Sequence, residues 1–121
     1  MKKVLVVDDE PNFQTFVKII LKDRFEVISC HSGEDAFRVL KFEKPDIIAL
    51  DIVMPGLDGL SVIKKLKKNE NTKNIPVIFL SVIDKAKKAY ELGAVDYLLK
   101  PFEKPQLLRS IERAISGQKF N

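Results

Sequence analysis

Four short apolar segments of the chain each end directly at a polar residue. Short continuous apolar runs that alternate with helical patterns are typical of buried strands in a parallel sheet. In such a sheet the carboxyl ends of the strands lie on one edge, where ligands bind. We therefore expect the polar residues to meet in one pocket. The runs are 4–7 before Asp8 and Asp9, 47–50 before Asp51, 77–80 before Ser81, and 97–99 before Lys100.

Helical patterns separate these runs, and a further strand is expected at 25–30. The first helix is expected at about 12–22. Its apolar residues are spaced i, i+3, i+4, i+7 and i+8, which predicts a single apolar face. Strand and helix thus alternate five times, which predicts helices on both faces of a parallel sheet, joined by right-handed crossovers. The apolar face of the first helix consists of Phe13, Phe16, Val17, Ile20 and Leu21.

Local signals mark the ends of the other helices. Ser32 with Asp35 predicts an N-terminal cap for the second helix, and Asp58 predicts one for the third. The fourth helix is expected to be short, at about 85–92, with Gly93 just beyond its end. The fifth is expected to open near Pro105.

Length and composition indicate one domain over residues 1–121, with enough apolar residues (45%) for a packed core. No apolar stretch approaches the roughly 20 residues that span a bilayer, so no membrane insertion is expected. The acidic residues at 8–10 follow the first apolar run, where a signal peptide would carry small residues. The one cysteine, Cys30, cannot form an internal disulfide, which favours a reducing, cytoplasmic location.

The formal net charge of +4 raises the question of nucleic-acid binding. The excess comes largely from lysines on predicted helix surfaces, and no aromatic residues alternate with them. This pattern favours a solvated face, so no direct contact with nucleic acid is expected. The lysines are Lys64, Lys65, Lys67, Lys68, Lys85, Lys87 and Lys88.

The three expected carboxylates of Asp8, Asp9 and Asp51 would repel one another unless a cation compensates. A hard, oxygen-seeking ion that keeps several waters suits such a set, so Mg²⁺ is expected, with Mn²⁺ as a possible substitute. The alternative interpretation is that Asp8 and Asp9 only cap the first helix. The presence of Asp51 at a neighbouring strand end favours the metal.

A carboxylate can also act as a nucleophile toward phosphorus, and Asp51 is the candidate. A positioned cation and a hydroxyl would hold the oxygens of the transferring group, and Lys100 and Ser81 could supply them. Taken alone, Ser81 could instead be a loop cap and Lys100 an exposed ammonium. The agreement of all four strand ends favours the phosphoryl site.

Four motifs resemble the response-regulator receiver domains of two-component signalling, in order and spacing and over essentially the whole chain. The resemblance implies a CheY-like, flavodoxin-like α/β fold: a doubly wound, five-stranded parallel sheet of order 2-1-3-4-5 with five helices. The motifs are Val-Asp-Asp-Glu at 7–10, Leu-Asp-Ile-Val-Met-Pro-Gly-Leu-Asp-Gly at 50–59, Leu-Ser at 80–81, and Gly-Ala-Val-Asp-Tyr-Leu-Leu-Lys-Pro-Phe at 93–102.

The resemblance also implies roles and partners. A sensor histidine kinase or phosphotransfer protein would donate the phosphoryl group, and a downstream protein would read the switch. The protein would be a monomer or a phosphorylation-dependent dimer, and no enzyme beyond its own phosphotransfer and autodephosphorylation. The implied sites are Asp51 as phospho-acceptor, Asp8 (through water), Asp9, Asp51 and the Val53 carbonyl as Mg²⁺ ligands, Lys100 on the phosphoryl group, Ser81 and Tyr97 as the switch pair, and a cis bond between Lys100 and Pro101.

Tyr97 has a simpler interpretation, because an aromatic residue in a strand is usually part of the core. Two departures from the family pattern also stand out. The segment between Ser81 and Gly93 is shorter than usual, which affects the expected output surface. Val82 stands where the family usually has a small alanine, beside the switch serine.

Three other functions compete. A Mg²⁺-dependent phosphatase of the haloacid dehalogenase type shares the residue types, but it normally has an acidic residue two positions after its nucleophile, where this chain has Val53. A degenerate, purely structural receiver conflicts with the intact Asp9, Asp51 and Lys100. A nucleotide-binding domain is disfavoured because no glycine-rich phosphate loop follows the first strand. A stand-alone receiver and a piece of a longer regulator both remain open.

Overall fold

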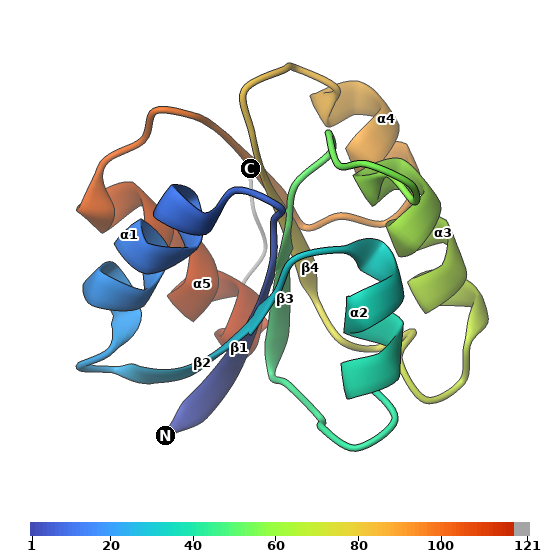
Figure 1. The fold of residues 1–121 in the computed structure, drawn as a ribbon, viewed down its shortest axis with the longest axis horizontal. Coiled ribbons are helices and arrows are strands. Elements are labelled where there is room, and N and C mark those ends of the chain that lie inside the picture. The colour runs from blue at the N-terminus through green and yellow to red at the C-terminus, as the bar shows by residue number, and fades with distance from the viewer. Residues whose placement is uncertain (118–121) are drawn as a thin grey trace.

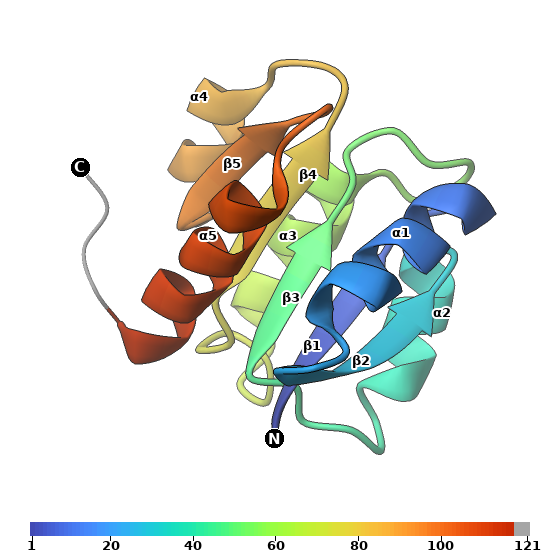
Figure 2. The ribbon, with the colours of Figure 1, turned by 90° about the vertical axis from the view of Figure 1, so that its left-hand side faces the viewer.

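The computed structural model describes residues 1–117, which form a five-stranded parallel sheet of order β2-β1-β3-β4-β5 flanked by helices (Figure 1). This confirms the predicted strand order. Figure 2 shows the strand arrowheads directed toward one edge of the sheet, as the argument from the strand ends requires. The strands are β1 (Lys2–Val7), β2 (Phe25–Cys30), β3 (Ile47–Leu50), β4 (Val77–Ser81) and β5 (Asp96–Leu99).

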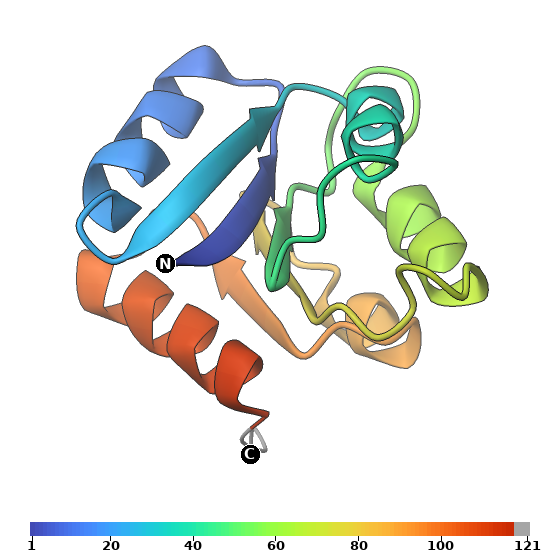
Figure 3. The same cartoon turned by 90° about the horizontal axis from the view of Figure 1, so that it is seen from below.

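The helices lie in two layers, with α1 and α5 on one face of the sheet and α2, α3 and α4 on the other (Figure 3). This is the doubly wound arrangement that the alternation of strand and helix predicts. The helices are α1 (Pro11–Leu21), α2 (Gly33–Val39), α3 (Gly59–Lys68), α4 (Ala86–Glu91) and α5 (Lys104–Ser116).

The predicted helix ends are confirmed at atomic level. The Ser32 side chain accepts a hydrogen bond from the Asp35 amide (3.0 Å), and Asp58 accepts one from the Ser61 amide (2.8 Å). Each bond satisfies an amide that has no partner within the first helical turn. Gly93 follows α4 with φ +109°, a conformation that strains residues with a side chain.

The core consists of two clusters, one on each face of the sheet. Successive strand residues point to opposite faces, so Leu5 and Val7 join the cluster under α2 and α3, while Val4 and Val6 join the one under α1 and α5. All of β3 is buried because both faces of this central strand are covered. Asp51, which follows directly after β3, therefore has a fixed backbone position.

The predicted apolar face of α1 is wrong in one respect, because Phe16 is 44% exposed. Val17 and Leu21 are fully buried, and the third member of their stripe is Gln14, which is only 4% exposed. Residues 14, 17 and 21 have the spacing i, i+3 and i+7, so they share one side of the helix. The polar Gln14 thus belongs to the buried side of the helix, whereas Phe16, which the prediction placed there, is partly exposed.

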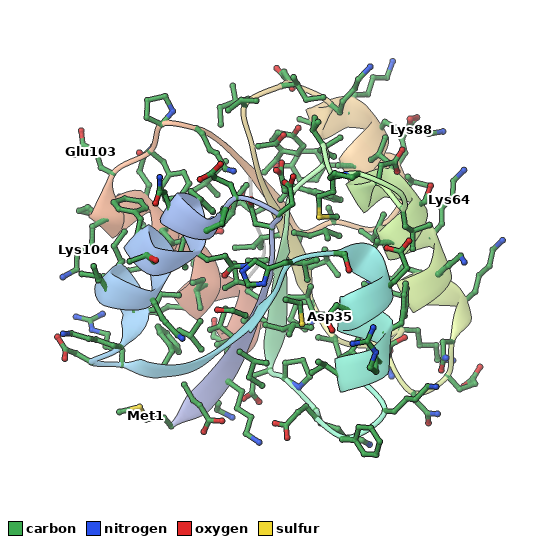
Figure 4. All side chains as sticks on the ribbon, in the orientation of Figure 1. Met1, Asp35, Lys64, Lys88, Glu103 and Lys104 are labelled. Carbon is green, nitrogen blue, oxygen red and sulfur yellow. The ribbon has the colours of Figure 1, made fainter. Side chains whose placement is uncertain are left out.

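Most of the predicted surface lysines do extend outward, as Lys64 on α3 and Lys88 on α4 do in Figure 4. Lys67 differs, because its ammonium donates hydrogen bonds to the carbonyls of Lys73 (3.1 Å) and Ile75 (3.2 Å). Partial burial lowers the pKa of Lys67. Within residues 1–117, no helix combines the length and apolar character needed to cross a membrane. The single-domain assignment stays a prediction, and residues 118–121 lie outside the described part.

Candidate functional site

The predicted carboxylates meet at the carboxyl edge of the sheet. Asp8 and Asp9 follow β1, Asp51 follows the adjacent β3, and one carboxylate oxygen from each lies within 4.8 Å of the others. Asp8 and Asp51 are buried, whereas Asp9 is exposed. The three side chains could therefore share one cation that remains open to solvent through Asp9.

The capping alternative for Asp8 and Asp9 does not fit the start of α1. Glu10 is the N-cap residue, and its side chain accepts a hydrogen bond from the Asn12 amide (3.0 Å). Asp8 instead accepts from the Glu10 amide through Oδ1 (2.9 Å) and from the Lys100 ammonium through Oδ2 (2.8 Å). Its carboxylate is thus held inside the cluster.

Asp51 is in an environment that disfavours its charged form. Burial raises the pKa of Asp51, the Lys100 ammonium lowers it, and the Asp8 carboxylate raises it. The Ser81 hydroxyl also lowers it, by a smaller amount than these. One carboxylate oxygen, Oδ1, is buried without a hydrogen-bond partner in the described structure. A cation bound at this oxygen would relieve both the desolvation and the repulsion.

The donor set fits Mg²⁺, since the clustered side chains offer carboxylate oxygens and one of these has no partner. Hard divalent cations bind such oxygens and complete their coordination with water. The predicted contribution of the Val53 carbonyl stays a prediction. Val53 itself is 53% exposed and follows two residues after Asp51.

Lys100 is the central cation of the site rather than an exposed ammonium. Its Nζ lies 2.8 Å from Asp8 Oδ2 and 3.7 Å from Asp51 Oδ2, and its side chain is only 15% exposed. The same Nζ lies 3.7 Å from the centroid of the Phe13 ring, within range of a cation–π contact. The bond between Lys100 and Pro101 is cis, as predicted. Lys100 can therefore reach a group attached to Asp51.

The predicted switch pair occupies neighbouring strands. Tyr97 is opposite Phe79 in the register of β4 and β5, with ring centroids 5.7 Å apart. Ser81 is two residues beyond Phe79, so it shares a face of the sheet with Tyr97. Ser81 is fully buried, whereas the Tyr97 hydroxyl reaches outward, donating to the Ile83 carbonyl and accepting from the Lys85 amide (3.1 Å).

Three exposed apolar residues, named the apolar mouth, follow the strand ends that carry Asp51 and Ser81. Val82 is 67% exposed and Ile83 is 36% exposed, both directly after β4, and Val53 faces solvent from the β3 side. A shallow cavity of about 310 Å³ adjoins Lys100, lined by aromatic residues of α1 and of the β5–α5 loop, by Val82 and by Pro101. Apolar side chains thus lie beside Lys100 and follow closely after both strand ends.

Two residues with a place in this site were missed by the sequence argument. Phe13 was assigned to the core alone; it does pack against the cluster under α1 and α5, and its ring also faces Lys100. Gln14 was not considered, although its amide contacts the β1 and β2 strand ends. Its position at i−3 from Val17 and i−7 from Leu21 was the available signal, because a polar residue on a buried stripe needs hydrogen-bond partners.

Comparisons with known proteins identify a family for this chain. The family model described as the response regulator receiver domain matches residues 4–112. The protein PilH of Pseudomonas aeruginosa is 35% identical over 97% of this chain and 100% of its own length. The alkaline phosphatase synthesis regulator PhoP of Bacillus subtilis is 39% identical over 84% of this chain, which corresponds to 43% of PhoP. The chain spans about half or less of PhoP and of three other curated relatives, two probable transcriptional regulators and a probable cyclic di-GMP phosphodiesterase.

Two solved structures show the same arrangement. The chemotaxis protein CheY4 of Vibrio cholerae superimposes with a TM-score of 0.88 at 28% identity, covering 94% of this chain and 98% of CheY4. The receiver domain of a sensor histidine kinase from Pseudomonas aeruginosa superimposes with a TM-score of 0.87 at 29% identity, covering 95% of this chain and 98% of that one. The latter structure has a magnesium ion coordinated in its active-site cleft.

Proposed function

The chain belongs to the response regulator receiver domain family, and we propose that it is a phosphorylation switch with Asp51 as the acceptor and Mg²⁺ as the cofactor. One observation carries the proposal. Lys100 stands between Asp8 and Asp51 at the point where three carboxylates converge, with one Asp51 oxygen left without a partner. A nucleophile, a positioned cation and a candidate metal site thus occupy one pocket.

The donor is a phosphohistidine of a sensor histidine kinase or of a phosphotransfer protein. A carboxylate oxygen of Asp51 forms a bond to phosphorus while the bond between phosphorus and the donor's imidazole nitrogen breaks. The electron pair of that bond returns to the imidazole, which leaves as neutral histidine. Bound Mg²⁺ would neutralise charge on the transferring group. Asp8, Asp9 and Asp51 would hold the ion, and Lys100 would bind a phosphoryl oxygen.

The response begins when the Ser81 hydroxyl turns to a second phosphoryl oxygen. Its movement makes room beside β4 for the ring of Tyr97, which shares that face of the sheet. An inward Tyr97 gives up its hydroxyl bonds to Ile83 and Lys85, so the segment between β4 and α4 is released. The surface of α4, β5 and α5 changes, and a downstream protein reads it.

A multiple-turnover phosphatase is the competing function. That chemistry needs an acid to protonate the leaving group, and the side chain two residues after Asp51 is the apolar Val53. We propose instead that the protein catalyses only its own phosphorylation and dephosphorylation. Incubation with a small phosphate ester separates the two functions, since a phosphatase releases many equivalents of phosphate per protein and a receiver does not.

The decisive test is the mass of the intact protein after incubation with a small phosphodonor such as acetyl phosphate. We expect one phosphoryl group on the wild type with Mg²⁺, and none on Asp51→Asn or on the wild type with excess chelator. The Asp51→Asn variant should also unfold at a higher temperature, because it removes a buried, repelled charge. Equal phosphate uptake by Asp51→Asn would exclude this acceptor.

A further inference from the structure

Gln14 makes an unusual set of contacts for a glutamine in a helix. Its side-chain nitrogen donates toward three backbone carbonyls, those of Val6 (3.1 Å), Asp8 (3.1 Å) and Cys30 (2.8 Å). The side chain is buried, and its Oε1 has no partner among the described residues. One amide on α1 therefore ties the end of β1 to the end of β2, directly behind the carboxylate cluster.

These bonds complete the immobilisation of Asp8. Its amide donates to the Cys30 carbonyl (3.0 Å), its Oδ1 accepts from the Glu10 amide, and its Oδ2 accepts from Lys100. The remaining polar atom of Asp8 is its carbonyl oxygen, and Gln14 is the side chain that holds it. That oxygen belongs to the peptide plane joining Asp8 to Asp9. Fixing this plane fixes the position of the Asp9 Cα, and the bond from the Glu10 amide to Asp8 Oδ1 restrains the backbone rotation that sets the direction of the Asp9 side chain.

We propose that Gln14 is a positioning residue for the metal site, acting through the backbone of Asp8 to orient the Asp9 carboxylate. The proposal rests on the proposed function, because it assumes that Asp9 binds Mg²⁺. Groups that hold metal ligands from behind affect metal affinity by about 10- to 100-fold in other proteins. Gln14 fits that description, although it lies outside the carboxylate cluster.

The chemistry of an amide suits this position. Three carbonyl oxygens converge on one nitrogen, so the group placed there must be a donor, and a carboxylate would be repelled. The amide has two hydrogens for three acceptors and leaves Oε1 unsatisfied, which costs stability in a buried position. A side chain that served packing alone would be better replaced by an apolar one. The buried, unpartnered Oε1 is therefore tolerated because the amide nitrogen positions the loop that carries Asp8 and Asp9.

The test compares Gln14→Met with the wild type by calorimetric titration of Mg²⁺. Methionine preserves the length and approximate volume of the side chain but removes the donor. Thr72→Val is the matched control, because Thr72 is also buried and its hydroxyl donates to one backbone carbonyl, that of Leu66 (2.8 Å). Thr72 precedes β4 and so lies at the opposite edge of the sheet from the carboxylates. Thermal unfolding of each variant measures its loss of stability.

We expect Gln14→Met to bind Mg²⁺ about 10-fold more weakly, and Thr72→Val to bind it within twofold of the wild type even where both variants lose similar stability. Wild-type affinity in a folded Gln14→Met protein would overturn the positioning role and leave the proposed function intact. A wild type that binds no Mg²⁺ would overturn both.

A second measurement needs no variant and covers the case in which Gln14→Met does not fold. In NMR spectra of the wild type, the side-chain amide protons of Gln14 should exchange slowly with solvent. They should also shift on titration with Mg²⁺, as the peptide between Asp8 and Asp9 adjusts. Rapid exchange, or signals that ignore Mg²⁺ while the Asp9 amide responds, would overturn the proposal.

Discussion

The acidic end of β1 and the segment that joins β4 to α4 lie on the same edge of the sheet but are held very differently. Every polar atom of Asp8 has a partner, from four different segments of the chain. The segment 82–85, in contrast, has exposed Val82 and Ile83 and relies on the Tyr97 hydroxyl as its tie to β5. The helix that follows, α4, has six residues and Ala89 as its buried residue; its N-cap residue Lys85 makes no capping bond, and Asp84 accepts from the Ala86 amide (3.0 Å).

The firmly held end of β1 suits the phosphoryl-transfer chemistry, whereas the loosely held segment between β4 and α4 suits the conformational response. Phosphoryl transfer needs groups that are already in place, because reorganisation during the reaction raises the barrier. A switch needs an element whose alternative positions differ little in free energy, and segments with few buried contacts supply it. The segment between Ser81 and Gly93, which the sequence comparison with the family predicts to be shorter than usual, includes this loosely held part.

Alkylation of Cys30 tests the rigid end and should show the largest effect. Burial, assisted by the Asp35 carboxylate, raises the pKa of the Cys30 thiol from 9.0 to about 12. The thiolate is the reactive form, so at pH 8 its fraction is reduced by about 1000-fold relative to a thiol with the unshifted pKa. The iodoacetamide rate should continue to rise with pH above 9, where an ordinary cysteine levels off.

The control for this measurement is the protein in denaturant, where Cys30 should react at the rate of a free cysteine. The Cys30 carbonyl accepts from both Asp8 and Gln14, so the residue belongs to the same rigid cluster. Native alkylation within tenfold of the denatured rate at pH 8 would show that this end opens readily, and the contrast with the β4–α4 segment would fail.

Lys100→Ala should separate the two regions. Without the ammonium, Asp51 can still accept a phosphoryl group, but the cation that would bind an oxygen of that group is missing. Beryllofluoride, a mimic of the phosphoryl group, should change amide exchange in α4, β5 and α5 of the wild type. We expect less than about a tenth of that change in the variant, since removing one such group costs about 100-fold or more in other sites.

The Lys100→Ala variant should also lose some stability, because Lys100 is largely buried between two carboxylates. Replacement of an exposed lysine would have little effect on stability. Lys104→Ala provides the control, since Lys104 is an exposed lysine at the start of α5 (Figure 4). A full response to beryllofluoride in Lys100→Ala would refute the role of the cation. Changes confined to α1 and α2 of the wild type would refute the assignment of the output surface.

Much of this arrangement could be predicted from the sequence because its causes are local. Apolar runs define the strands, parallel pairing places their ends together, and the residues at those ends are then neighbours. The position of Lys100 between Asp8 and Asp51 follows from this logic. Its burial does not, because it depends on where the rings of Phe13 and Phe102 lie, and those are set by packing between α1 and the β5–α5 loop.

Gln14 and Phe16 show the limit of pattern reading. An apolar face defined by i, i+3, i+4 and i+7 is wider than the stripe that the sheet covers, so periodicity alone could not decide which of its edges is buried. The contacts of Gln14 decide it, since the carbonyls of Val6, Asp8 and Cys30 all accept from its amide on that side of the helix. The tie between Tyr97 and the 82–85 segment is likewise a feature of the loop conformation, which the residue types do not specify.

The apolar mouth predicts a long-lived aspartyl phosphate. Hydrolysis needs a water in line with the phosphorus–oxygen bond. Val53 and Ile83 are exposed apolar residues, two positions after Asp51 and Ser81, and we expect them to flank that approach without being able to orient the water. The double variant Val53→Asn with Ile83→Glu should lose phosphate at least about tenfold faster, a barrier change of roughly 1.4 kcal/mol. The decay should be followed by intact mass in Mg²⁺ after the phosphodonor is removed.

Ile19→Asn is the control for the double variant, because Ile19 is an exposed apolar residue on α1 that does not line the mouth. Its decay should match the wild type. If the double variant decays no faster than Ile19→Asn, apolar shielding is the wrong explanation, and the mouth would then have no more influence on hydrolysis than a distant surface.

Tyr97→Phe tests the loose end and should have the smallest effect. The variant keeps the ring that packs against Phe79 but removes the hydroxyl that bridges the Ile83 carbonyl and the Lys85 amide. A hydrogen bond at a partly exposed position contributes about 1 kcal/mol, so exchange of the Lys85 amide should accelerate about fivefold. Tyr90→Phe is the matched control, because the Tyr90 hydroxyl bonds to Asp96 and not to the 82–85 segment. If Tyr97→Phe leaves exchange at Lys85 unchanged, the segment is held by something other than this hydroxyl. Tyr97 could then not release it by turning inward, and the coupling between the rigid and the loose region would have to run through another residue.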